Sequence, residues 1–106
     1  MTGYFYACQI MFSDSASRDS VIMLISDQLA LMTLIDTPQV DSMKLANDES
    51  IIVRCSFSSD ADRQTVRTAI AAKLLEPEIS PALVRENHIK GNYTIGSADP
   101  MSTEVF

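Results

Sequence analysis

The apolar stretch from Tyr4 to Phe12 is the first regular element that the residue pattern predicts. It is rich in aromatic and branched side chains and leads into a polar Ser-Asp-Ser run, which is typical of a β-strand entering a turn. Alternate side chains of a strand point to opposite faces, and both faces are largely apolar here. One face carries Tyr4, Tyr6, Cys8, Ile10 and Phe12, and the other carries Phe5, Ala7, Gln9 and Met11. We therefore predict a strand that is covered on both sides.

A helix is predicted next, with Ser15 or Ser17 as its N-cap and an end at about Ile35. Apolar residues at helical spacing form one stripe, and further apolar residues extend it well around the axis. The stripe consists of Val21, Leu24, Ile25, Leu29 and Met32. Such a helix is expected to have a second apolar contact besides one face of a sheet. Periodicity leaves another interpretation open, in which residues 29–35 form a strand.

A hairpin and a second helix are predicted in the middle of the chain. Residues 40–45 and 50–57 flank the polar connection 46–49, and the second arm alternates between an apolar and a more polar face. Ser59 or Asp60 then caps a helix whose apolar spacing continues to Leu74. The helix ends before Pro77, because the residue that precedes a proline avoids the α region.

The last part of the chain is predicted to hold a strand or strand pair over residues 82–95, with a bend at Gly91 and Asn92. Residues 96–106 show no period, although Val105 and Phe106 are apolar enough to dock on the domain. The length of 106 residues fits one domain. We expect that domain to span residues 1–96 and a C-terminal tail to span residues 97–106.

These elements follow each other as β-α-β-β-α-β, the order of the ferredoxin-like split βαβ motif in the α+β class. Right-handed crossovers then give a four-stranded antiparallel sheet in the order 4-1-3-2, with both helices on one face. The first and third strands become neighbours, which brings Cys8 close to Cys55. The other face of the doubly apolar first strand needs a cover, and a second copy of the chain is the simplest one.

With these elements the chain resembles the dimeric α+β barrel group of ferredoxin-like proteins, which includes the antibiotic-biosynthesis monooxygenases. The resemblance rests on the strand Tyr4 to Phe12, the hairpin arm Ser50 to Phe57 and the helix from Asp60 onward. It implies a homodimer in which two sheets face each other as a barrel. Enzymes of this group often carry a tryptophan or histidine near the pocket, whereas this chain has no tryptophan and one histidine. The resemblance therefore transfers the architecture and the dimer but no catalytic residue.

Composition and charge argue against several classes of function. Eight Lys and Arg against 14 Asp and Glu give a net charge of −6, and the scattered cations argue against a nucleic acid partner. The most apolar window is too short and too interrupted to span a membrane, and no secretory signal is visible. Two cysteines outside any CxxC spacing suit a reducing cytoplasm. We predict neither a metal nor a cofactor, because there is no ligand cluster and no glycine-rich nucleotide loop.

His88 is the candidate catalytic residue, because an imidazole transfers protons near neutral pH without much tuning. Strand alternation puts Glu86 on the same face, where a carboxylate orients the imidazole as a base. The non-functional interpretation of this pair is a solvated polar strand edge, which is the more common arrangement. The sequence leaves both interpretations open.

Tyr4, Tyr6, Tyr93 and Arg54 are candidate ligand-binding residues together with Glu86. The tyrosines present apolar rings with polar tips, although core or interface packing is their more common role. Arg54 lies in a central strand, where it either anchors an anionic ligand or pairs with a carboxylate across the dimer, and the ion pair is favoured. The cysteines have no visible activating base and are expected to be buried thiols.

The expected function is the binding of a small apolar molecule in a cavity of a dimeric α+β barrel. Such a cavity could also support a cofactor-independent monooxygenase or isomerase activity with His88 as its base. The alternative is a non-catalytic homodimeric interaction or assembly module, and a ligand-sensing regulatory domain is a third. A cavity of several hundred Å³ that holds His88 or the tyrosines favours the first. The residues identify no substrate.

Overall fold

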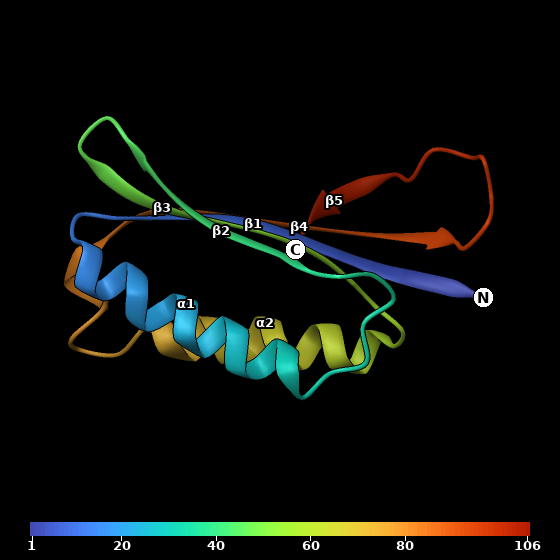
Figure 1. The fold of residues 1–106 in the computed structure, drawn as a ribbon, viewed down its shortest axis with the longest axis horizontal. Coiled ribbons are helices and arrows are strands. Elements are labelled where there is room, and N and C mark those ends of the chain that lie inside the picture. The colour runs from blue at the N-terminus through green and yellow to red at the C-terminus, as the bar shows by residue number, and fades with distance from the viewer.

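A computed structural model describes residues 1–106 as one five-stranded sheet with two α-helices (Figure 1). The elements are β1 (Thr2–Phe12), α1 (Ser15–Ala30), β2 (Gln39–Leu45), β3 (Asp48–Phe57), α2 (Asp60–Leu74), a 3₁₀ helix (Ser80–Ala82), β4 (Leu83–Thr94) and β5 (Thr103–Val105). All strand pairs are antiparallel, in the order β2-β3-β1-β4-β5. Read from β4 to β2, this sheet has the predicted order 4-1-3-2, and β5 is added at the β4 edge. The ferredoxin-like α+β fold is therefore confirmed. Neither helix is long and apolar enough to cross a membrane.

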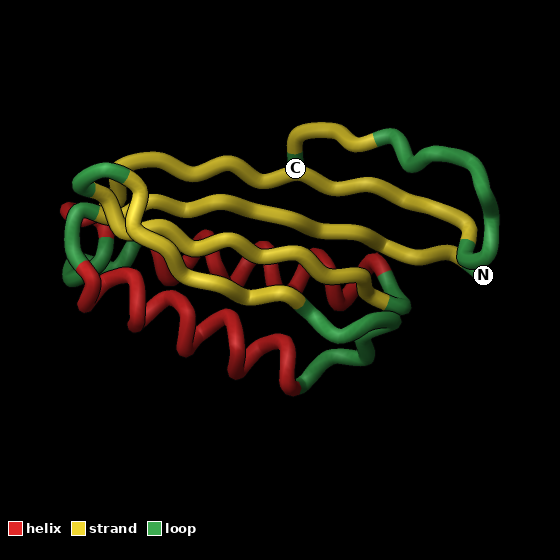
Figure 2. Tube along the Cα trace, turned by 45° about the horizontal axis from the view of Figure 1, so that its top comes forward, coloured by secondary structure: helices red, strands yellow, loops and turns green.

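Both helices lie on the same side of the sheet, and the core fills the space between the two layers (Figure 2). The central strand β1 turns its Tyr6, Cys8, Ile10 and Phe12 side chains toward the helices, and all four are buried. The helices return apolar stripes from Val21, Ile25 and Leu29 of α1 and Val66, Ile70 and Leu74 of α2. Full burial of such side chains contributes about 1.5–3 kcal/mol each. The second apolar contact of α1 is the neighbouring α2.

The opposite side of the sheet, which we call the open face, carries no helix (Figure 2). Phe5, Ala7, Gln9 and Met11 of β1 lie on it, as alternation with the buried residues requires. Part of this face is covered by the C-terminal segment, because Met101 packs directly over Gly91 of β4. A Cβ atom on Gly91 would lie 2.8 Å from the Met101 Sδ, so this close approach depends on the glycine.

The first helix ends at Ala30 and not at about Ile35 as predicted, and the alternative strand over residues 29–35 is wrong as well. Its N-cap is Asp14, whose side chain accepts a hydrogen bond from the Ser17 N–H at 2.7 Å, and its last residue is Ala30. Leu34 then forms an isolated bridge to Phe57, and the Ile35 N–H donates to the Ser56 oxygen. Hydrogen bonds to the end of β3 thus replace another helical turn and lead the chain to the sheet edge.

The last strand and the tail also differ from expectation. β4 is one continuous strand without a break at Gly91 and Asn92, so the strand pair was wrong. The tail contributes the short strand β5, which pairs with residues 89–91 at the β4 edge. The Phe106 ring docks against the Tyr6 ring at 5.6 Å between centres, whereas Val105 is 86% exposed. Only one of the two terminal apolar residues therefore docks.

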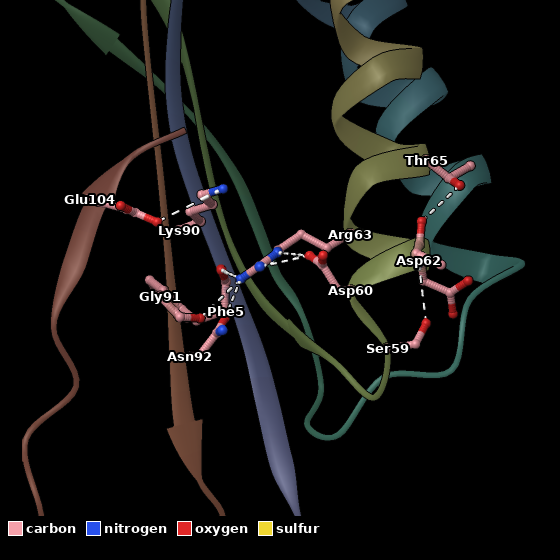
Figure 3. A network of polar contacts seen from close by, with 11 residues as sticks. Phe5, Ser59, Asp60, Asp62, Arg63, Thr65, Lys90, Gly91, Asn92 and Glu104 are labelled. Carbon is pink, nitrogen blue, oxygen red and sulfur yellow. Dashed lines mark hydrogen bonds and ion pairs between the residues drawn. The ribbon is translucent and has the colours of Figure 1, made fainter.

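Arg63 ties α2 to the neighbouring strands β1 and β4 from inside the protein (Figure 3). It is only 3% exposed, and its Nη1 donates to the backbone oxygens of Phe5 and Gly91 and to the Asn92 side chain at 3.0–3.2 Å. Its Nε and Nη2 donate to the Asp60 carboxylate at 3.0 and 2.7 Å. A buried cation is tolerated only with such partners, so the guanidinium fixes how the helix lies on the sheet.

Replacing Arg63 by Met is expected to lower the free energy of unfolding by about 3 kcal/mol. The substitution leaves the Phe5 and Gly91 oxygens buried without a side-chain donor and removes the pair with Asp60. Urea denaturation followed by circular dichroism measures the loss. Arg85→Met is the matched control, because Arg85 is exposed on β4 and should cost about 0.5 kcal/mol or less. Equal losses in the two variants contradict the role given to Arg63.

Candidate functional site

Three of the predicted site residues meet on the helix-facing side of the sheet. The Tyr6 hydroxyl of β1 lies 2.7 Å from the His88 Nδ1 of β4, and the His88 Nε2 lies 3.2 Å from a Glu86 carboxylate oxygen. Tyr6 is fully buried and His88 is 6% exposed, whereas Glu86 reaches solvent. His88 is therefore not on a solvated strand edge, and the Glu86 carboxylate orients its imidazole as the strand alternation predicts.

The hydrogen-bond partners fix the protons of this cluster. A carboxylate only accepts, so the His88 Nε2 carries the proton donated to Glu86, and the Tyr6 hydroxyl donates to the Nδ1. Burial lowers the pKa of His88, and the positive charge of Arg67 lowers it further, whereas the hydrogen bond that His88 donates to Glu86 raises it. Burial, with the Cys8 thiol adding to it, raises the pKa of Tyr6 far above its ordinary range. At neutral pH the phenol and the imidazole are both uncharged.

Arg67 and Phe106 close the cluster at the β4 edge, and both were missed as parts of it. The Phe106 ring centre lies 5.7 Å from the Arg67 guanidinium carbon and 5.0 Å from the Lys90 Nζ. The Arg67 Nη1 is buried and makes no hydrogen bond. Arg67 follows the buried Arg63 by four residues on α2, and this helical spacing was the available signal that it faces the sheet.

The other predicted residues lie elsewhere. Tyr4 shares the helix-facing side with Tyr6, but its ring lies 5.3 Å from the Arg63 guanidinium carbon and outside the histidine cluster. Tyr93 lies on the open face, where its ring covers Gly3 so closely that a Cβ atom there would overlap it. Arg54 also lies on the open face, with its guanidinium carbon 5.7 Å from the centre of the Phe5 ring. The predicted set is thus divided between the two faces of the sheet.

An apolar hollow of about 430 Å³ lies on the open face, above Ala7. Ala7 pairs in register with Arg54 of β3 and with Ile89 of β4, and its methyl group is too short to fill the space between those longer side chains. The hollow is open to solvent and mostly apolar. Its lining residues are Phe5, Ala7, Cys8, Gln9, Ile52, Val53, Arg54, Asn87, Ile89, Met101 and Thr103. Neither His88 nor any of the tyrosines lines it.

A polar hollow of about 580 Å³ lies where α2 meets the edge of β4 and β5, in the region drawn in Figure 3. Its cations already have carboxylate partners, because Arg63 binds Asp60 and the Lys90 Nζ lies 3.8 Å from Glu104. This hollow therefore offers no free charge to a ligand, and the contacts that line it serve the packing of α2 and β5.

Metal and thiol chemistry find no support in the geometry. No group of three or more His, Cys, Asp or Glu side chains is placed to hold a metal ion. Cys8 and Cys55 are free and buried near each other on the helix-facing side. Burial raises the pKa of Cys8 to about 11 and, together with Cys8, that of Cys55 to about 12. Both thiols stay protonated at neutral pH and are poor nucleophiles, as expected.

Comparison of the sequence with protein-family models and with curated protein sequences finds no match. The structure, however, is similar to solved ferredoxin-like structures. A de novo designed protein, Foldit4, superimposes with a TM-score of 0.63 at 10% identity, over 87% of this chain and 97% of that one.

Two natural proteins are similar as well. A dimeric ferredoxin-like protein of unknown function from Thermobifida fusca has a TM-score of 0.54 at 13% identity, over 84% of this chain and 89% of that one. A variant of SnoaB, a cofactor-independent oxygenase from Streptomyces nogalater, has a TM-score of 0.57 at 9% identity, over 92% and 97%. These similarities confirm the ferredoxin-like architecture that the resemblance implied, and they bear on the fold alone.

Replacing His88 by Gln is expected to flatten the dependence of stability on pH between about pH 5 and 7. The folded-state pKa of His88 lies below its ordinary value of 6.5, so the unfolded chain binds the proton more readily. Its contribution to stability is therefore complete above pH 6.5 and is lost as the pH falls through the folded-state pKa. Urea midpoints over this pH range measure the slope.

Tyr6→Phe is the matched control, because it removes the same hydrogen bond and keeps the buried imidazole. Its stability should be lower at every pH but should retain most of the slope of the unmodified protein, because burial is the largest cause of the lowered His88 pKa. An unchanged slope in His88→Gln contradicts the assignment of this titration to His88.

Proposed function

We propose that this protein is a homodimer that binds a small, largely apolar molecule in the hollow above Ala7. The observation that carries the proposal is the hollow of about 430 Å³ on the one face of the sheet that no helix covers. Sites for small molecules are concave and mostly apolar, with a few polar groups that orient the ligand. Gln9, Asn87 and Thr103 are such groups beside the apolar floor.

The second copy is proposed because the open face exposes apolar side chains. Ile52 is half-buried, Ile89 is 36% exposed, and Met43 and Leu45 on β2 are 42% and 37% exposed. Apolar side chains exposed together on one sheet face are typical of an interface, and a two-fold contact between open faces covers them in both copies at once. A dimeric protein of this fold from Thermobifida fusca is consistent with the arrangement.

The proposal is binding rather than catalysis, because the lining of the hollow contains no histidine, tyrosine or carboxylate. His88, the expected base of a monooxygenase or isomerase, lies on the helix-facing side, where its two ring nitrogens bond Tyr6 and Glu86. In this proposal the cluster supports the packing of β4 on β1. The non-catalytic assembly module remains the alternative, and it differs by forming the dimer without a ligand.

Replacing Ile89 by Glu should convert the dimer to a monomer, because it places one buried carboxylate from each copy in the same two-fold interface. Sedimentation velocity at micromolar concentration measures the change. Met23→Glu is the control, because Met23 is 67% exposed on α1 and should leave the dimer intact. An unmodified protein that sediments as a monomer contradicts the proposed dimer.

Replacing Ala7 by Leu should fill the hollow and weaken binding of the neutral apolar dye Nile red at least about tenfold, because the added atoms occupy the site. Dye fluorescence titration measures the affinity. Ala16→Leu, an exposed change in the first turn of α1, should bind like the unmodified protein. A dimeric protein without saturable dye binding supports the assembly module instead.

A further inference from the structure

Arg54 is the only charged side chain in the lining of the hollow, and it has no carboxylate partner. In this acidic chain most cations have one within 4 Å. Arg18 pairs with Asp19 and Glu49, Lys44 with Glu49, Arg63 with Asp60, Lys73 with Glu76 and Lys90 with Glu104. Arg54 makes neither an ion pair nor a hydrogen bond to another side chain, although 14 Asp and Glu are available in the chain.

The guanidinium of Arg54 is nevertheless held in a defined place. Its central carbon lies 5.7 Å from the centre of the ring of Phe5, a residue that is itself buried. Contact with an aromatic face leaves the N–H groups at the edge of the guanidinium free to donate. Arg54 also lines a smaller hollow of about 180 Å³, together with Asp36, Thr37 and Gln39. The Arg54 side chain therefore borders both hollows.

We infer that the ligand of the hollow is an amphipathic anion, with its apolar part over Ala7 and its carboxylate or other anionic group on Arg54. The inference rests on the proposed binding function and names the chemical class of the ligand. The apolar floor selects the body of the ligand, and the unpaired guanidinium selects the charge, because a bidentate bond to a carboxylate uses the fork of free donors. An amine is disfavoured, because no carboxylate lines the main hollow.

The test compares octanoate with 1-octanol, which share an apolar chain and differ in charge at pH 7.5. Isothermal titration calorimetry on the full chain should show octanoate binding about tenfold or more tightly, as a charge-assisted hydrogen bond predicts. Arg54→Met keeps an unbranched apolar stem, and it should bring the two affinities within about twofold of each other.

Arg85→Met is the matched control. Arg85 lies on the same open face of β4 and also lacks a carboxylate partner, but it does not line the hollow. This variant removes the same charge from the same face and should keep the preference for octanoate. Loss of the preference in both variants would mean that general surface charge attracts the anion, which overturns the inference.

Two further results distinguish a failure of this inference from a failure of the proposed binding function. Equal affinities for octanoate and 1-octanol in the unmodified protein, both abolished by Ala7→Leu, overturn the anionic class and leave the hollow as a binding site. Absence of binding by both compounds and by Nile red overturns the proposed function itself. Finally, if Arg54→Met weakens the dimer in sedimentation without changing the preference, Arg54 pairs with a carboxylate of the second copy, and the inference is wrong.

Discussion

The structure depends on one constraint, which is that the central strand β1 is apolar on both faces while the helices cover only one. On the helix-facing side, Tyr6, Ile10 and Phe12 form the middle of the core, and the burial of these large side chains orders the two layers. On the open face, Phe5 and Met11 are also buried within the single chain. Met101 of the C-terminal segment lies over Gly91, the register partner of Phe5, and the Arg85 side chain contacts the Met11 sulfur. Ala7 is too small to fill its own position, and the hollow lies there.

The alternation of the strands then decides which candidate residues act together. Tyr6, Glu86 and His88 occupy positions of the same parity on neighbouring strands and meet beneath α2, whereas Arg54 and Tyr93 have the opposite parity and reach the open face. A shift of one residue would exchange the two sets. The sheet therefore separates the cluster of Tyr6, His88 and Glu86 from the apolar hollow that Arg54 lines. This separation is the reason that the proposed function is binding and not proton transfer.

Much of the fold could be predicted because its determinants are local. The two-faced strand, the alternation of residues 51–57 and the Ser59 cap are each readable within a few residues, and the order of elements fixes the sheet. The end of α1 could not be predicted, because Ile35 bonds to Ser56 across the fold. The strand β5 has no pattern of its own and exists because the β4 edge offers unpaired groups. Among the site residues, the Glu86–His88 pair is local, whereas Phe106 reaches Tyr6 only through that edge pairing.

The hollow shows most clearly what sequence pattern leaves out. It arises from a difference in side-chain length between Ala7 and its register partners Arg54 and Ile89, which lie 47 and 82 positions away along the chain. The backbone architecture is shared with proteins of unrelated sequence, so it supplies an uncovered sheet face but no particular ligand. What distinguishes this chain is which side chain is short on that face and which cation beside it lacks a partner. In the proposed site, a few open-face positions that the core does not constrain would set the selectivity for a ligand.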